Sequence, residues 1–189
     1  GRGIRSLRRG MRRIRSEHIR KKFGKDSHKP GFHRNFMEYV YDVWSTGWTG
    51  YSFNTELFPD PDAFLKKLKD DGYRVTFDIH PSMGVRWFED DYEKMATAMD
   101  IDPKSKKAVA FDITNKRFIE NYFDILHHPM EKKGVDFWWI DWQQQGGTRI
   151  EGYDVLWMLN HCHYTDNARN GRRPLLFSRY AEMGSHRYP

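Results

Sequence analysis

Short runs of aromatic and β-branched residues alternate along the chain with segments of helical periodicity, and this alternation constrains the fold more than any other feature. The runs have the composition that pleated strands prefer. They cover residues 37–44, 73–80, 135–142 and 174–180. Strands separated by helices form βα units on a parallel sheet. The sequence therefore predicts an α/β fold with parallel strands.

The segments between these runs carry helix signals. In residues 59–72, Asp60 or Asp62 can cap the first turn and Gly72 suits the exit. Further helices are predicted over residues 88–99, 116–134 and 154–169. Pro129 is expected to end or kink the helix in which it lies, because proline lacks the N–H that continues the hydrogen-bond ladder.

The net charge of +6 is unevenly distributed. Residues 1–34 hold thirteen Lys or Arg against Glu17 and Asp26, whereas residues 35–189 hold more acidic than basic side chains. We therefore expect a poorly ordered basic arm over 1–34 and an α/β domain over 35–189. The arm is either an attachment to nucleic acid or anionic lipid or a solvated tail foreign to the domain. No aromatic residues are interleaved with its arginines, so no specific nucleic-acid partner is expected.

Several kinds of site are excluded by the composition. Cys162 is the single cysteine, which rules out an intrachain disulfide and a cysteine metal cluster. The offsets of His127 from His128 and of His161 from His163 point the imidazoles of each pair apart on a helix, so no metal is predicted. A phosphate-binding loop is also absent, so no cofactor is expected. Without a run of about 18 apolar residues or a secretory signal, the chain is expected to be soluble, in a compartment left open.

Polar side chains gather where the predicted strands end. In a parallel sheet the ligand-binding groups lie at the carboxyl ends of the strands and in the loops that follow. The residues found there are Asp78 and His80, Asp141 and Gln143, and Ser178 and Arg179. We expect these side chains to face one pocket at the carboxyl ends of the strands.

Asp141 lies in "GVDFWWIDWQQQGG", between Trp139 and Trp142 in a run that otherwise indicates a buried strand. Burying an unpaired carboxylate costs several kcal/mol. Aromatic residues form 16% of the chain, and aromatic clefts suit the flat apolar faces of sugar rings. Asp141 is therefore either a nucleophile or electrostatic stabiliser held ionised by a nearby cation, or a structural residue that accepts backbone hydrogen bonds in a turn.

The neighbouring candidates leave similar alternatives open. Arg179 can pair with Asp141 in a structural ion pair, or it can donate hydrogen bonds to sugar hydroxyls. Asp78 and His80 alternate with Phe77 and Ile79, so they share one side of their strand. They can contact a substrate directly or support residues that do.

Three stretches together carry a resemblance to a known family: "GWTGYSFNTELFPDPDAFLKKLKDDGYRVTFDIHPSMGV", "GVDFWWIDWQQQGGT" and "GYDVLWMLNHCHYTDNARNGRRPLLFSRYAEMGSHRYP". They closely resemble glycoside hydrolase family 31, the retaining α-glycosidases that include α-glucosidases and α-xylosidases. The likeness covers about residues 46–189. It implies that residues 35–189 form part of a TIM (β/α)8 barrel, with a carbohydrate as substrate.

The resemblance also implies residue roles. The aspartate of the family's W-x-D motif is the nucleophile, which here is Asp141, and Trp139 and Trp142 line the pocket. The arginine that follows F-S, here Arg179, contacts the sugar. The strand ending in "FDIHP" carries His80 and Asp78 to the same pocket.

One part of the family pattern lies outside this sequence. The family's general acid is an aspartate in a G-D motif shortly after R-Y-P, and the sequence ends at Pro189. The expected function is retaining hydrolysis of α-glycosidic bonds, with the acid/base beyond this segment and the segment alone inactive. The alternative is a non-catalytic fragment that binds carbohydrate or polyanion. Sugar, linkage and oligomeric state are left open.

Overall fold

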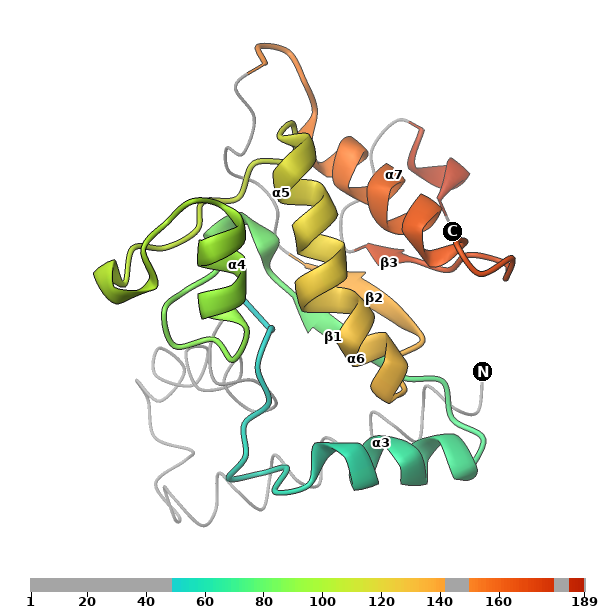
Figure 1. The fold of residues 1–189 in the computed structure, drawn as a ribbon. Coiled ribbons are helices and arrows are strands. Elements are labelled where there is room, and N and C mark those ends of the chain that lie inside the picture. The colour runs from blue at the N-terminus through green and yellow to red at the C-terminus, as the bar shows by residue number, and fades with distance from the viewer. Residues whose placement is uncertain (1–48, 142–149, 179–183, 189) are drawn as a thin grey trace, which may run out of the picture.

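The computed structural model describes residues 49–141, 150–178 and 184–188, and a three-stranded parallel sheet lies at its centre (Figure 1). The strands are β1 (Thr76–Ile79), β2 (Phe137–Ile140) and β3 (Phe177–Ser178), in the order β1-β2-β3. The predicted parallel α/β arrangement is confirmed for these three runs, although each strand is shorter than predicted. The predicted strand 37–44 and the basic arm lie outside the described residues.

Helices connect the strands. The α-helices are α3 (Pro61–Asp70), α4 (Tyr92–Ala98), α5 (Lys116–Asn121), α6 (His128–Lys133) and α7 (Val155–Asn167). The remaining helical segments are η2 (Pro81–Met83), η3 (Pro103–Ser105), η4 (Tyr122–His127) and η5 (Ser185–Arg187). Asp60 caps α3 by accepting a 2.9 Å hydrogen bond from the Ala63 amide, and Asp154 caps α7 by accepting one of 2.7 Å from Trp157. Of the two predicted caps for the first helix, Asp60 is the correct one.

The predicted helix over 88–99 begins later than expected, at Tyr92. Asp91 occupies the N-cap position without a capping hydrogen bond from its side chain. The acidic residues before it were predicted to form the first helical turn. Glu89 is instead buried, with hydrogen bonds to a distant segment of the chain.

The predicted helix over 116–134 is interrupted by a π-helical segment, η4, between α5 and α6. Pro129 lies in the first turn of α6 and has no N–H to offer the preceding turn. The helix does not end at Pro129, because α6 runs on to Lys133, and the π-helical segment lies just before it. A π turn pairs residues i and i+5 and is wider than an α turn, so it accommodates a shift in the hydrogen-bond pairing between α5 and α6. The His127 side chain helps here, because its Nδ1 lies 2.8 Å from the Tyr122 carbonyl oxygen, which can only accept.

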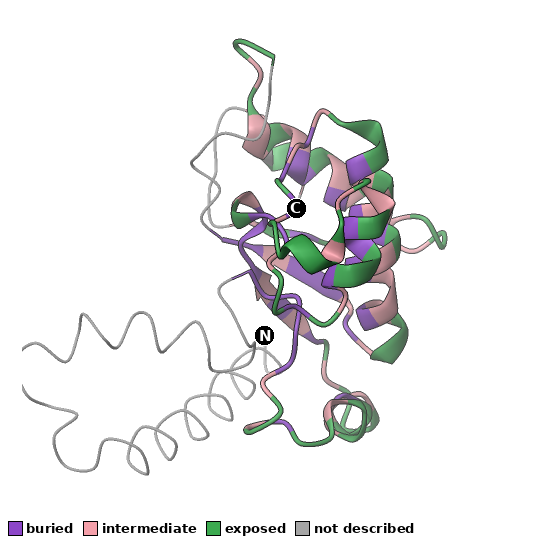
Figure 2. Ribbon diagram, turned by 60° about the vertical axis from the view of Figure 1, so that its left-hand side comes forward, coloured by how far each residue is buried: buried purple, intermediate pink, exposed green. Residues whose placement is uncertain are grey.

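Helices α5, α6 and α7 lie on one side of the sheet, as the two views in Figures 1 and 2 agree. Trp138 of β2 faces them: its ring centroid lies 4.5 Å from that of His127, and its Nε1 donates a 2.9 Å hydrogen bond to Glu131 of α6. Side chains alternate along a strand. Trp139 and Asp141 therefore project from the opposite face of the sheet.

Two histidines lie in the core between these helices. His127 and His163 are buried, their ring centroids are 5.0 Å apart, and the Nε2 of His163 lies 2.8 Å from the Tyr122 hydroxyl. Burial lowers the pKa of His127 to about 3 and lowers the pKa of His163 well below its usual value. Both are therefore neutral at pH 7. Offsets along one helix could not predict this pair, because its members come from η4 and α7.

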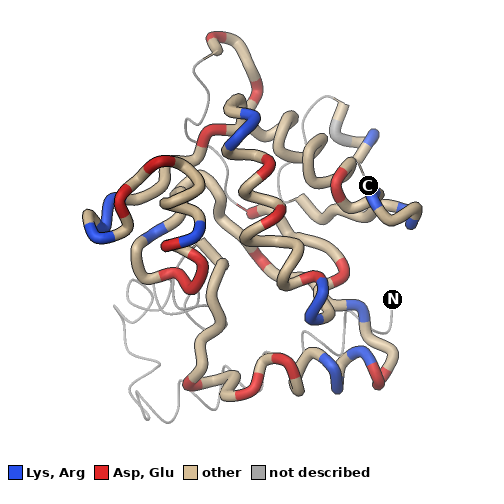
Figure 3. The backbone as a smooth tube through the Cα atoms, in the orientation of Figure 1, with Lys and Arg blue, Asp and Glu red and all other residues tan. Residues whose placement is uncertain are grey.

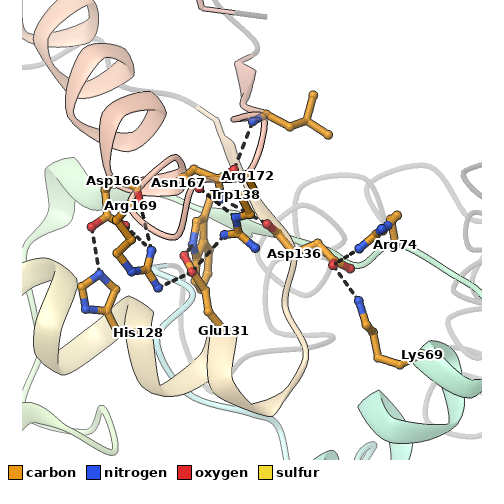
Figure 4. Close-up of polar contacts among 11 residues, drawn as sticks. Lys69, Arg74, His128, Glu131, Asp136, Trp138, Asp166, Asn167, Arg169 and Arg172 are labelled. Carbon is orange, nitrogen blue, oxygen red and sulfur yellow. Dashed lines mark hydrogen bonds and ion pairs between the residues drawn. The ribbon is translucent and has the colours of Figure 1, made fainter.

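Charged side chains hold the amino-terminal end of the sheet together (Figure 4). Asp136, just before β2, accepts hydrogen bonds from Lys69 at 2.6 Å, Arg74 at 2.9 Å and the Val75 amide at 2.8 Å. Burial opposes ionisation of Asp136, but these hydrogen bonds bring its net pKa below the usual value. These contacts lie at the end of β2 opposite to Asp141, so they stabilise the sheet away from the predicted site residues.

A second group of contacts at this end centres on Glu131. Its carboxylate pairs with Arg169 at 2.6 Å and with Arg172 at 3.2 Å, and it also accepts the Trp138 hydrogen bond. The group thus ties α6 to β2 and to the residues that follow α7. Elsewhere basic and acidic side chains alternate on exposed surfaces, for example along α3 (Figure 3), where pairs such as Lys66 and Asp70 are solvated and contribute little.

Gly84 provides a test of the turn that follows β1. Its φ is +68°, and a Cβ added there would lie 2.2 Å from the Val109 carbonyl oxygen. Gly84→Ala should therefore lower the free energy of unfolding by about 3 kcal/mol, from the left-handed backbone together with the displacement of residue 109. Urea unfolding followed by circular dichroism measures this.

The matched control is Gly72→Ala. The φ of Gly72 is +81°, but nothing lies within 4 Å of an added Cβ. This variant should lose about 1 kcal/mol, the backbone contribution alone. Equal losses in the two variants would show that the close approach to Val109 has no energetic consequence.

Candidate active site

The register between β1 and β2 brings the predicted site residues together. Asp78 pairs with Trp139 and Ile79 pairs with Ile140. The ladder continues past the ends of both strands, since the Asp141 amide donates a 3.1 Å hydrogen bond to the Ile79 carbonyl. Asp78 and His80 therefore share the face of Trp139 and Asp141, which is the face turned away from the helices.

Three of these side chains form a close group at the carboxyl ends of the strands. One ligand atom from each of Asp78, His80 and Asp141 lies within 4.8 Å of the others. The His80 Nε2 lies 3.9 Å from Asp141 Oδ2, too far for a direct hydrogen bond. His80 and Asp141 are buried, with 2% and 4% of their surface exposed, and Asp78 is half-buried.

This geometry permits two kinds of chemistry. Two carboxylates and an imidazole are ligands that a divalent cation accepts, so Asp78, His80 and Asp141 are the residues of the described part that could hold one. The same groups can also receive the hydroxyls of a sugar and bring a carboxylate to its anomeric carbon. No metal was predicted from the sequence, and the aromatic surroundings favour the second reading.

An aromatic pair lies on the same face of the sheet. Trp139 and Phe177 are opposite one another on β2 and β3, with ring centroids 5.3 Å apart and an angle of 40° between the rings. Phe177 is 46% exposed, and Trp139 is half-buried. The buried Nε1 of Trp139 has no acceptor within the described ranges. This pair offers an apolar surface on the same face of the sheet as the carboxylates, and surfaces of this kind suit sugar rings.

The sequence-predicted site is thus partly assembled. Asp78, His80, Trp139 and Asp141 come together on one face, and their strands are adjacent and parallel, as predicted. Ser178, predicted to join them, pairs with Ile140 and therefore lies on the other face of the sheet. Arg179, Trp142 and Gln143 lie outside the described residues, so their predicted roles stay predictions.

Glu89 is a buried polar residue close to the site that sequence reasoning missed. It is 4% exposed, and it accepts hydrogen bonds from the hydroxyls of Thr49 and Ser52, the latter at 2.5 Å. Burial raises the pKa of this carboxyl, while the two hydroxyl donors oppose that rise. Its one sequence signal was its position between Phe88 and Asp90, which we interpreted as the start of a helix.

Comparison with known families places this geometry in context. Residues 36–189 match the family described as the glycosyl hydrolases family 31 TIM-barrel domain. The chain belongs to glycoside hydrolase family 31. Membership identifies it as a glycoside hydrolase domain whose substrate is a carbohydrate. No curated protein matches the chain.

The family 31 match spans all three strands of the sheet and the four site residues on it. It confirms the predicted resemblance, which was based on the motifs around Asp78, Asp141 and Ser178. Within the described ranges, none of the helices combines the length and apolarity needed to cross a bilayer.

Proposed function

We propose that this family 31 domain forms part of a (β/α)8 barrel that hydrolyses α-glycosidic bonds with retention of configuration, with Asp141 as the nucleophile. The observation that carries the proposal is the register of β1 and β2, which groups Asp78 and His80 with Trp139 and Asp141 on one face. Asp141 directly follows the last residue of β2, so of the two grouped carboxylates, Asp78 and Asp141, it lies nearer the carboxyl ends of the strands.

The mechanism follows from these positions. A retaining glycosidase needs one carboxylate to attack the anomeric carbon and a second carboxyl, roughly 5 to 5.5 Å away, to protonate the leaving oxygen. Asp141 would form the glycosyl ester. The second carboxyl would then deprotonate the water that hydrolyses this ester. We assign that acid/base to residues beyond Pro189.

Asp78 is the other carboxylate near Asp141, and its depth argues for binding rather than proton transfer. It is level with Trp139, two residues deeper along the strand direction than His80 and Asp141. The leaving group of the substrate departs toward the carboxyl ends of the strands. A carboxylate that lies farther from these ends therefore contacts the side of the sugar opposite to the leaving group. We assign Asp78 and His80 to the sugar hydroxyls, Trp139 and Trp142 to the walls of the pocket, and Arg179 to a hydrogen-bonding fork on the sugar.

The test uses a protein in which this chain continues into the following part of the barrel. Aryl α-glycosides should be cleaved, and proton NMR of the first product should show the α-anomer, as double displacement requires. An activated fluoro-sugar should trap the ester, and peptide mapping should place it on Asp141. A β-anomer as first product, or a label on another carboxylate, would refute the mechanism.

A further inference from the structure

The loop after β1 contains a buried carboxylate that the proposed chemistry does not use. Glu89 accepts hydrogen bonds from the Thr49 and Ser52 hydroxyls, and the Asp90 amide donates a 2.8 Å hydrogen bond to the Ser52 hydroxyl. Thr49 and Ser52 are 1% and 0% exposed. The loop and the segment around Thr49, forty residues apart in sequence, are therefore joined by a hydrogen-bonded cluster shielded from water.

This cluster is connected to the active site through the backbone. The His80 amide donates a 3.1 Å hydrogen bond to the Thr49 carbonyl. His80 in turn lies 3.9 Å from Asp141, measured between Nε2 and Oδ2. Two hydrogen bonds thus lead from Glu89 through Thr49 to the backbone of His80.

We infer that Glu89 is a positioning residue, which fixes Thr49 and thereby holds His80 at the distance from Asp141 that the bound sugar requires. The inference rests on the proposed function for its catalytic consequence. The buried carboxylate suits this task, because it accepts from two hydroxyls at once and has a fixed place between them. Displacing a group at a catalytic centre by a fraction of an ångström lowers the rate of the chemical step more than it weakens binding.

Amide hydrogen exchange, measured by NMR on the full chain, tests the structural step without any need for activity. In Glu89→Ala the His80 amide should exchange at least about tenfold faster, because its acceptor Thr49 is released. The Asp141 amide, which donates to Ile79 instead, is the internal reference and should change much less. Glu89→Gln keeps one carbonyl acceptor and should give an intermediate rate for His80.

Asp91→Ala is the matched control from the same loop. The Asp91 carboxylate pairs with the exposed Lys94 at 2.6 Å, so its loss should leave the exchange of His80 unchanged. Equal acceleration of the His80 and Asp141 amides in Glu89→Ala would mean a general loss of stability and would overturn the inference.

Kinetics in the extended protein test the catalytic step. Glu89→Gln should lower kcat by about tenfold while KM changes by less than about twofold, since the sugar contacts themselves remain. An unchanged kcat in a variant whose His80 amide is released would show that the position of His80 is unimportant for turnover. If the wild-type protein cleaves no α-glycoside, the proposed function fails, while the exchange result still decides whether Glu89 positions His80.

Discussion

Replacing Asp141 by asparagine should lower the turnover of aryl α-glycosides by about four orders of magnitude, which is roughly 5 to 6 kcal/mol on the activation barrier. The amide keeps the shape of the side chain but cannot form the glycosyl ester. Binding of the sugar should survive within a few-fold, because Trp139 and Asp78 are unchanged. Steady-state rates and equilibrium binding of a product sugar, both in the extended protein, measure the two effects.

A smaller variant separates the chemical role of Asp141 from a structural one. Asp141→Gly leaves a space beside the anomeric carbon, and azide added from solution should enter it and restore turnover, giving a glycosyl azide of inverted configuration. Structural damage would not be repaired by a small anion. Near-normal turnover in Asp141→Asn would show that the aspartate is a turn residue, which is the alternative that the sequence left open.

The second large effect is a loss of stability in mild acid. His127 and His163 are buried and neutral, and burial has lowered both pKa values, that of His127 to about 3. In the unfolded chain each imidazole titrates near pH 6.5. Stability is therefore unaffected above that pH and falls as pH decreases below it, because the unfolded state alone gains protons. Between pH 7 and pH 5 the loss from His127 should reach about 2 kcal/mol, and His163 should add to it in the same direction.

Urea unfolding at a series of pH values measures this loss. In the unfolded wild-type chain both imidazoles take up a proton as the pH falls, whereas in His127→Phe only His163 does, so the stability of this variant should depend less steeply on pH. The variant should also be less stable at pH 7, because it loses the hydrogen bond to the Tyr122 carbonyl. If the wild-type protein and His127→Phe gave the same slope, protonation of the buried pair would not be what destabilises the fold.

The parallel sheet and the grouping around Asp141 could be predicted from the sequence because both depend on local patterns. Strand composition located β1 and β2, and the two-residue period of a strand placed Asp78 with His80. A parallel sheet then aligns the carboxyl ends of its strands. The Asp141 neighbourhood follows from these rules without any knowledge of side-chain packing.

Other features depended on contacts between distant segments and could not be predicted. Glu89 is buried because Thr49 and Ser52 provide hydroxyls for it, and neither partner leaves a signal near residue 89. The His127–His163 pair likewise requires that η4 and α7 be packed together. The π-helical turn is an intermediate case, since Pro129 predicted an end or a kink of the helix, whereas the structure has a π-helical segment just before it.

The side chain of Asn167 influences which residues of β3 lie on the face of the sheet that carries Trp139 and Asp141. Its Nδ2 donates a 3.1 Å hydrogen bond to the Asp136 carbonyl, and its Oδ1 accepts one of 3.0 Å from the Leu175 amide (Figure 4). The amide thus substitutes for a peptide group between the starts of β2 and β3 and fixes their relative offset. A slip of one residue would exchange the two faces of β3 and turn Phe177 away from Trp139. One asparagine at the far end of the sheet therefore supports the register that places Phe177 beside Trp139.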